Sequence, residues 1–136
     1  MSVLEVQTMI HTIDHMSINV SDLGRSIDFY CNKLGFRVSR TLDTPELNIV
    51  FVQLGASSLE LIARKDRPAA TKTAPRTDGM GLAHMALRVS NIDEVFSQLK
   101  EKGVEFSSPP YDASGGPRIA FFRDPDGVML ELIQWQ

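Results

Sequence analysis

The chain has 136 residues, of which 43% are hydrophobic and 23% charged, and it carries a net charge of −3. These values suit one globular domain and give no basis for binding nucleic acid or an anionic membrane. No apolar run approaches the roughly 20 residues that span a bilayer, and the first residues lack the basic start of a signal peptide. A single cysteine, Cys31, excludes an internal disulfide and fits a reducing compartment, so we expect a cytoplasmic protein.

The sequence around His15 alternates in polarity and predicts a strand with two unlike faces. Met16, Ile18 and Val20 form its apolar face, which must pack on a neighbouring element. The opposite face carries Ile13, His15, Ser17 and Asn19.

A helix is expected directly after this strand. Its apolar positions recur at helical spacing, at Leu23, Ile27, Tyr30 and Leu34. Ser21 or Asp22 can cap its start, and Gly35 is suited to its end. Three further strands are expected near 36–41, 48–54 and 58–63.

The second half repeats this order. The segment from His84 to Ile92 matches the segment from His15 to Leu23, and Leu-Glu-Leu-Ile occurs at both 59–62 and 130–133. This is an internal duplication. A second helix is expected, capped by Asn91, built on Ile92, Val95 and Leu99 and ended by Gly103. Its strands are expected near 104–107, 118–123 and 129–134.

The predicted fold is therefore α+β, with two βαβββ modules in one domain spanning 1–136. The first module covers about 11–64 and the second about 82–135, with a linker at about 65–81 that is rich in basic residues, Pro, Ala and Thr. The segment 107–117 contains one Pro-Pro pair and one Gly-Gly pair and is a possible lid. Asp-Pro-Asp-Gly at 124–127 predicts a tight turn.

Each module supplies one histidine and one glutamate at matching places, His15 with Glu60 and His84 with Glu131. Taken singly, a glutamate between two leucines is more often a solvent-facing strand residue. All four, however, are expected on the sheet face that no helix covers, where partly desolvated carboxylates need a cation. Two imidazoles and two carboxylates suit Ni²⁺, Co²⁺, Fe²⁺ or Mn²⁺ with two open positions, or Zn²⁺ with fewer. His11 has no counterpart and is expected to be structural.

The opening IDHMSINVSDLGRSIDFYCNKLGF, the second-half LAHMALRVSNIDEV and the ending FFRDPDGVMLELI carry a resemblance over about residues 11–135. The chain resembles the vicinal oxygen chelate superfamily, which includes glyoxalases, bleomycin and fosfomycin resistance proteins, methylmalonyl-CoA epimerases and extradiol dioxygenases. The ligand set His15, Glu60, His84 and Glu131 is most similar to that of bacterial glyoxalase I, or lactoylglutathione lyase.

This resemblance implies a metal-dependent lyase or isomerase that converts a thiol hemithioacetal of methylglyoxal to a lactoyl thioester through an enediolate. It implies Ni, Co or Zn as the metal, with Fe or Mn as further options, and Glu131 as the base, with Glu60 as a ligand or second base. It also implies a homodimer. Relatives build the metal site either within one chain or across two, and the sequence leaves both open.

The substrate end of the site departs from the glutathione-using pattern. That pattern has Arg four residues after the first His and Asn four residues after the first Glu, where this chain has Asn19 and Arg64. Arg64, Arg88 and Arg118 are expected to receive an anionic tail of glutathione or another thiol conjugate. A CoA-thioester epimerase, a dioxygenase, or a non-catalytic resistance protein that binds a ligand remain the alternatives.

Overall fold

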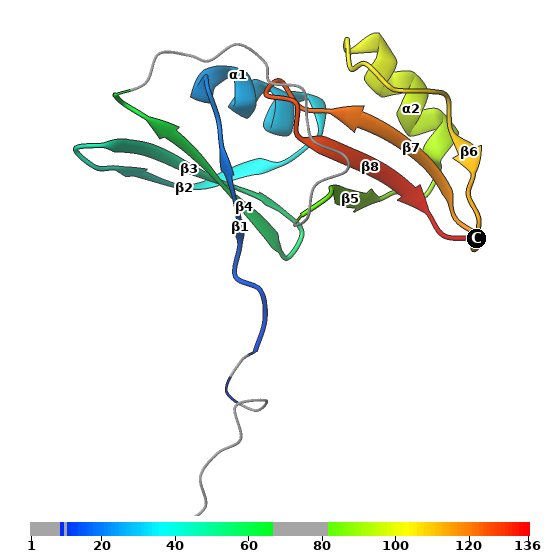
Figure 1. Cartoon of the computed structure of the whole chain (residues 1–136), viewed down its shortest axis with the longest axis horizontal. Coiled ribbons are helices and arrows are strands. Elements are labelled where there is room, and N and C mark those ends of the chain that lie inside the picture. Colours follow the sequence, from blue (N-terminus) through cyan, green and yellow to red (C-terminus); the bar gives the residue numbers. More distant parts are fainter. Residues whose placement is uncertain (1–8, 10, 67–81) are drawn as a thin grey trace, which may run out of the picture.

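The structure, a computed structural model, describes residues 9, 11–66 and 82–136. The elements of the first module, shown in Figure 1, are β1 (Met16–Asn19), α1 (Leu23–Ile27), a π-helix η2 (Asp28–Lys33), β2 (Arg37–Asp43), β3 (Leu47–Leu54) and β4 (Ser57–Arg64). Those of the second are β5 (Met85–Arg88), α2 (Ile92–Glu101), β6 (Tyr111–Asp112), β7 (Arg118–Arg123) and β8 (Met129–Gln134). None of the helices in these described ranges is long and apolar enough to span a membrane.

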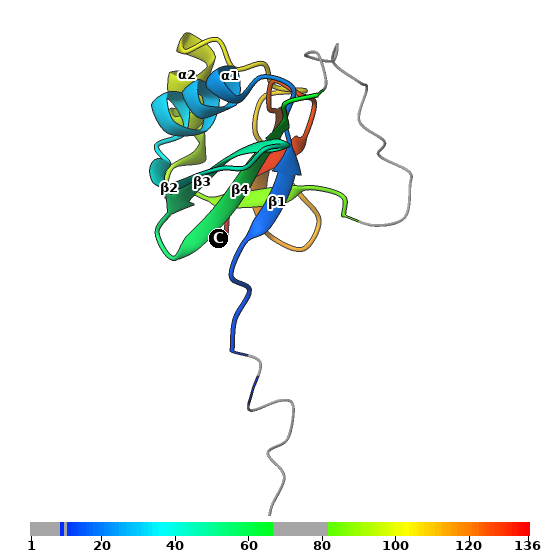
Figure 2. The ribbon, with the colours of Figure 1, turned by 90° about the vertical axis from the view of Figure 1, so that its left-hand side faces the viewer.

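The strands form two four-stranded sheets of the same topology, in the orders β1-β4-β3-β2 and β5-β8-β7-β6. In each sheet the first strand pairs in parallel with the last, and the remaining pairs are antiparallel. The views in Figures 1 and 2 show α1 and α2 gathered at one end of the molecule, next to their own sheets. This arrangement confirms the predicted fold class, a duplicated βαβββ unit.

Both main helices begin at the predicted capping residues. The Asp22 side chain accepts a hydrogen bond of 3.0 Å from the amide of Arg25, and Asn91 accepts one of 3.3 Å from Glu94. Of the two candidates for the first cap, Asp22 is therefore the residue used. Gly35 follows the first helical segment with a φ of 91°, a backbone conformation that favours glycine.

Two predicted elements differ from the structure. The first helix changes from α to π geometry at Asp28, and the Leu34 amide bonds to the Phe29 carbonyl five residues earlier, at 3.1 Å. No strand forms at 104–107, where only Phe106 makes a single bridge to β7. The fourth strand is instead β6, inside the segment predicted to be irregular. Pro109 and Pro110 have no N–H to donate, so pairing starts again only after them.

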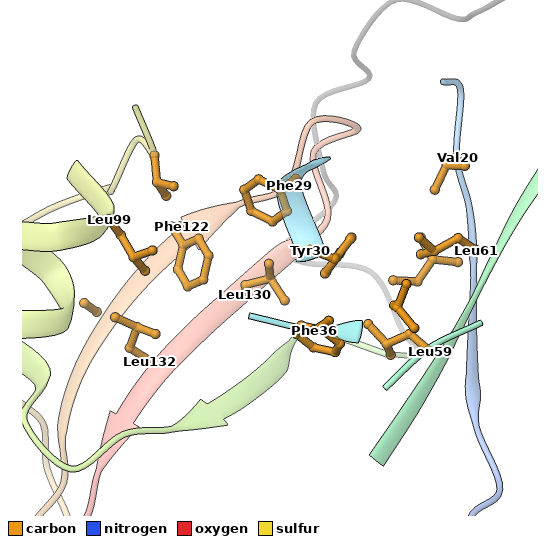
Figure 3. Close-up of a cluster of buried hydrophobic side chains, with 14 of the residues drawn as sticks. Val20, Phe29, Tyr30, Phe36, Leu59, Leu61, Leu99, Phe122, Leu130 and Leu132 are labelled. Carbon is orange, nitrogen blue, oxygen red and sulfur yellow. The ribbon is translucent and has the colours of Figure 1, made fainter. Parts of the chain in front are cut away.

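One hydrophobic core runs through both modules. Figure 3 shows Tyr30 and Phe36 placed between Leu61 of the first sheet and Leu130 of the second. Tyr30 is fully buried, and Phe29 lies 6.4 Å from the ring of Phe122 in β7. Because η2 places both aromatic side chains in this core, the helix of the first module also packs on the second sheet.

The predicted turn at 124–127 also joins the modules. It is confirmed by the Gly127 amide, which bonds to the Asp124 carbonyl at 3.0 Å. The next acidic residue, Asp126, accepts hydrogen bonds from the amide and hydroxyl of Ser21. The turn of the second module is therefore attached to the start of α1. The predicted linker lies outside the described residues, apart from its first two positions.

Candidate metal centre

The first His–Glu pair lies on the helix-free face of the first sheet. Glu60 stands directly opposite Ser17 in the parallel β1–β4 ladder, and His15 lies just before β1. The His15 Nε2 atom is 3.8 Å from Oε1 of Glu60. Leu59 and Leu61, the neighbours of Glu60 in β4, are buried in the core on the other face. Strand alternation therefore turns this carboxylate away from the helices, as predicted.

The second pair repeats this geometry. Glu131 stands opposite Ala86 in the parallel β5–β8 ladder, and His84 lies just before β5. The His84 Nε2 atom is 3.5 Å from Oε2 of Glu131. The duplication seen in the sequence therefore produces two equivalent half-sites, one on each sheet.

A phenylalanine lies beside each pair, and neither was predicted. Phe51 stands opposite Glu60 in β3, and its ring makes an edge contact with His15, with centroids 5.3 Å apart. Phe121 stands opposite Glu131 and contacts His84 in the same way, at 5.5 Å. The matching Ile-x-Phe of 49–51 and 119–121 is the sequence signal that could have identified them.

Both carboxylates are largely removed from water. The side chain of Glu60 is 16% exposed and that of Glu131 is 10% exposed. Among the described residues, the polar partner of Glu131 is His84, at a distance too long for a hydrogen bond. Partial desolvation of a carboxylate is unfavourable, and a bound cation would offset that cost.

The donor chemistry of each pair fits a divalent metal. Two ligand atoms that each lie about 2.1 Å from one ion are about 3.0–3.4 Å apart, so the observed separations need only small side-chain adjustments. The described part of one chain, however, gathers no group of three or more His, Cys, Asp or Glu side chains around one point. Each pair thus offers two of the four predicted ligands, and a single chain does not bring His15 and Glu60 to the second pair.

The four predicted substrate residues have different surroundings. Asn19 is exposed at the end of β1, four residues after His15. Arg64, at the end of β4, forms an ion pair with Asp66 of 3.1 Å, which raises the pKa of the guanidinium. Arg88 is exposed and forms no ion pair with the other described residues.

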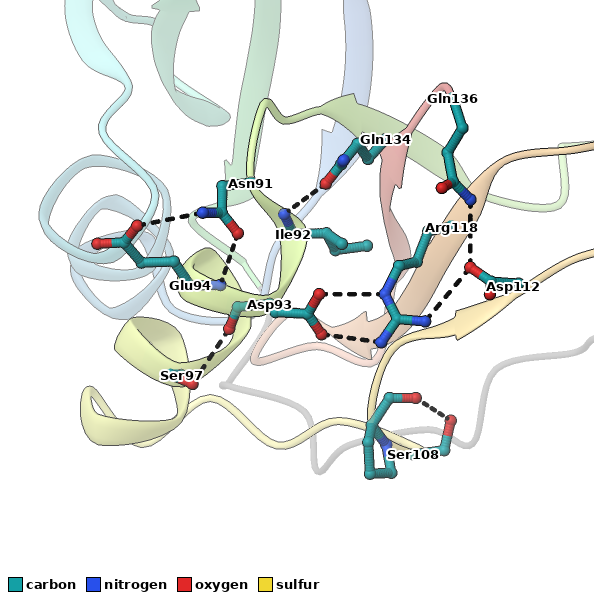
Figure 4. A network of polar contacts seen from close by, with 11 residues as sticks. Asn91, Ile92, Asp93, Glu94, Ser97, Ser108, Asp112, Arg118, Gln134 and Gln136 are labelled. Carbon is teal, nitrogen blue, oxygen red and sulfur yellow. Dashed lines mark hydrogen bonds and ion pairs between the residues drawn. The ribbon is translucent and has the colours of Figure 1, made fainter.

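Arg118 does not face the candidate centre. In Figure 4 its guanidinium lies between Asp93 of α2 and Asp112 of β6, with contacts of 2.9 and 3.3 Å. Its opposite residue in β8 is Gln134, which accepts a hydrogen bond from the amide of Ile92 at the start of α2. Arg118 therefore connects the helix to the sheet on the face opposite Glu131.

A cavity of about 710 Å³ opens where the two modules meet. His15 and Leu59 line it from the first module, and Met85, Arg88 and Leu130 line it from the second. This cavity includes the predicted metal ligand His15 and places it on one surface with Arg88.

The fold, the duplication and the paired ligands agree with a match to a known family. The chain belongs to the glyoxalase/bleomycin resistance protein/dioxygenase superfamily, whose family model matches residues 12–132.

Individual relatives point to more than one reaction. A probable lactoylglutathione lyase of Synechocystis is 34% identical, with 88% of this chain and 92% of the relative covered. Human mitochondrial methylmalonyl-CoA epimerase is 34% identical over 90% of this chain and 73% of its own length. A solved glyoxalase family protein from Enterococcus faecalis superposes with a TM-score of 0.77 at 34% identity, covering 92% of this chain and 98% of the other.

Proposed function

We propose that this protein is a metal-dependent glyoxalase I-like enzyme that isomerises a hemithioacetal of methylglyoxal and a thiol to a lactoyl thioester. The observation that carries this proposal is the pair of equivalent His–Glu half-sites on helix-free sheet faces. The similarity to lactoylglutathione lyases supports it. Ni²⁺, Co²⁺ and Zn²⁺ are the metals we would test first, before Fe²⁺ and Mn²⁺.

The complete centre is proposed to form between two copies of the chain. His15 and Glu60 of one copy would join His84 and Glu131 of a second copy, and a two-fold axis would generate two identical centres. The separation of the half-sites within one chain supports this assembly. The helix-free sheet faces would then enclose the centre and remove the four ligands from water.

The chemistry assigned to the chain is proton transfer between neighbouring carbons. When bound, a divalent metal polarises the substrate carbonyl and stabilises negative charge on its oxygens. Glu131 accepts the proton from the carbon that bears sulfur and returns it to the adjacent carbon, while a second proton moves between the two oxygens, so no oxidant is needed. His15 and His84 act as neutral ligands, and Glu60 as the anionic ligand or second base.

Arg88 is the residue we assign to an anionic substrate tail. It has no ion pair with a described residue and shares the 710 Å³ cavity with His15. A free guanidinium at such a place can bind a carboxylate with two parallel hydrogen bonds. Asn19 and Arg64 lie on the same sheet face as Glu60 and remain proposed contacts. Arg118 is left out of the site because its donors are used by α2 and β6.

A second candidate is epimerisation of a CoA thioester. The identity of 34% to the human epimerase favours it, and the same base and metal would serve. The carboxylate at Glu60, where such epimerases usually have glutamine, favours the glyoxalase reaction instead. The two candidates separate cleanly, because each predicts turnover of one substrate class only.

Metal content and turnover test the proposal together. Protein purified without chelator is analysed for metal beside His15→Ala and Glu131→Gln, and assayed with the methylglyoxal–glutathione hemithioacetal after addition of Ni²⁺, Co²⁺ or Zn²⁺. About one metal per chain and turnover that Glu131→Gln abolishes would support the glyoxalase reaction. Metal binding without this turnover would favour the second candidate, a reaction on an acyl-CoA substrate. Failure of every preparation to bind metal would overturn the metal centre itself.

A further inference from the structure

The two half-sites differ in the groups that surround them. Ser17 donates a hydrogen bond of 2.7 Å from its hydroxyl to Oε1 of Glu60. Asp14 lies with Oδ2 at 2.8 Å from Nδ1 of His15. The first half-site is therefore held by two polar side chains of its own module.

The second half-site has alanine at both corresponding places. Ala86 stands opposite Glu131 in the β5–β8 ladder, as Ser17 stands opposite Glu60 in the β1–β4 ladder. Ala83 directly precedes His84, as Asp14 precedes His15. Alanine has no side-chain donor or acceptor. The two modules therefore share the His–Glu pair, but the second lacks the two hydrogen bonds that Ser17 and Asp14 make in the first.

The hydrogen bond to Asp14 favours one tautomer of the neutral His15 ring. A neutral imidazole that donates from Nδ1 leaves the lone pair on Nε2, the nitrogen that faces Glu60. A carboxylate at the remote nitrogen also fixes the orientation of the imidazole ring. Ser17 holds the other ligand, because its hydrogen bond to Oε1 restricts the rotamer of Glu60 and keeps this carboxylate beside His15.

From this asymmetry we propose that Asp14 and Ser17 are positioning residues that make the His15–Glu60 half-site the anchor of the metal. The second half-site, His84 and Glu131, completes the coordination without comparable support. The inference rests on the metal centre of the proposed function but not on its substrate.

The test is the metal affinity of full-length protein stripped with chelator. Ni²⁺ and Zn²⁺ are titrated against a competing indicator, and metal release into excess EDTA is timed. Asp14→Ala and Ser17→Ala should each weaken affinity by about tenfold or more and speed release. Ser17→Thr keeps the hydroxyl and should restore most of the affinity. Ser97→Ala, on the exposed side of α2, is the matched control and should leave affinity unchanged.

The outcomes separate this inference from the metal centre. If His15→Ala and Glu60→Gln abolish binding while Asp14→Ala and Ser17→Ala leave affinity and release unchanged, the centre stands and the positioning role is wrong. The thermal midpoints of the stripped variants show whether a lost affinity comes from unfolding. A loss that Ser17→Thr fails to restore would also count against the role of the hydroxyl.

Discussion

The hydroxyl of Tyr30 donates a hydrogen bond of 2.8 Å to the carboxylate of Asp124, and both residues are buried. Tyr30 belongs to the π-helix of the first module, and Asp124 begins the turn between β7 and β8 of the second. Asp124 also accepts hydrogen bonds from the amides of Asp126 and Val128. This contact fixes the two sheets relative to each other, and with them the two half-sites.

Tyr30→Phe should destabilise the protein by about 1–3 kcal/mol, because it leaves a buried carboxylate without its side-chain donor. Urea unfolding measures the loss. The matched control is Tyr111→Phe in the exposed strand β6, where we expect a change within about 0.5 kcal/mol. Equal effects of the two substitutions would show that the buried hydroxyl contributes nothing specific.

Asp124 should also impose a pH dependence on stability. Burial raises the pKa of its carboxyl, an effect larger than the lowering by the hydrogen bonds that it accepts. A folded pKa above the unfolded value of about 3.9 means that the native state holds the proton more tightly. The stabilising contribution is therefore full below pH 3.9 and is lost as the pH rises through the folded pKa.

The stability difference between the wild type and Asp124→Asn isolates this contribution. As the pH rises from about 4, the free energy of unfolding of the wild type should fall relative to that of Asp124→Asn. The difference should become constant above the raised pKa. Urea unfolding of both proteins at several pH values measures it. A difference that stays constant from pH 4 to 7, or that shifts in favour of the wild type, would contradict a raised pKa.

Several of these features could be read from the sequence, and others could not. Alternation and duplication placed Glu60 and Glu131 on one kind of face, because strand periodicity follows directly from the order of apolar residues. Capping rules, which depend only on neighbouring residues, identified Asn91 and Gly35 and narrowed the first cap to Ser21 or Asp22. Local patterns thus predicted most of the elements and the two His–Glu pairs that lie on the helix-free faces.

Features that depend on register or on contacts between modules were missed. The Ser17–Glu60 hydrogen bond requires the pairing of β1 with β4, which lies 43 positions away in the chain. The place of Arg118 on the helix side of its sheet follows from the β7–β8 register, which pairs it with Gln134. In the π-helix, Phe29 and Tyr30 pack between the two sheets, a contact that local periodicity cannot report.

Ala86→Ser should lower kcat by about tenfold while metal binding is retained. A serine hydroxyl at this place would donate a hydrogen bond to Glu131, and one such bond stabilises the charged carboxylate and makes it a weaker base. Ala86→Cys, of similar size but with a weak donor, is the control. Steady-state kinetics with the metal-loaded protein decides the result. Equal losses in both variants would assign the effect to crowding and not to the hydrogen bond.

Arg88→Ala should raise KM for an anionic thiol conjugate by about tenfold or more, since a charge-assisted pair is lost. Arg118→Ala should leave KM unchanged, because this side chain already binds Asp93 and Asp112 on the opposite face. The comparison of KM for the two variants at equal metal loading is the measurement. A raised KM for Arg118→Ala alone would contradict the assignment.

In the proposed dimer, a complete metal centre joins the His15–Glu60 half-site of one chain to the His84–Glu131 half-site of another. The most direct measurement mixes the inactive variants His15→Ala and His84→Ala, refolds them together and determines metal content and turnover. A shared centre predicts recovery to about a quarter of the wild-type level, because random pairing makes half of the dimers mixed and each mixed dimer holds one intact centre. No recovery from a mixture in which mixed dimers are demonstrated would contradict the claim.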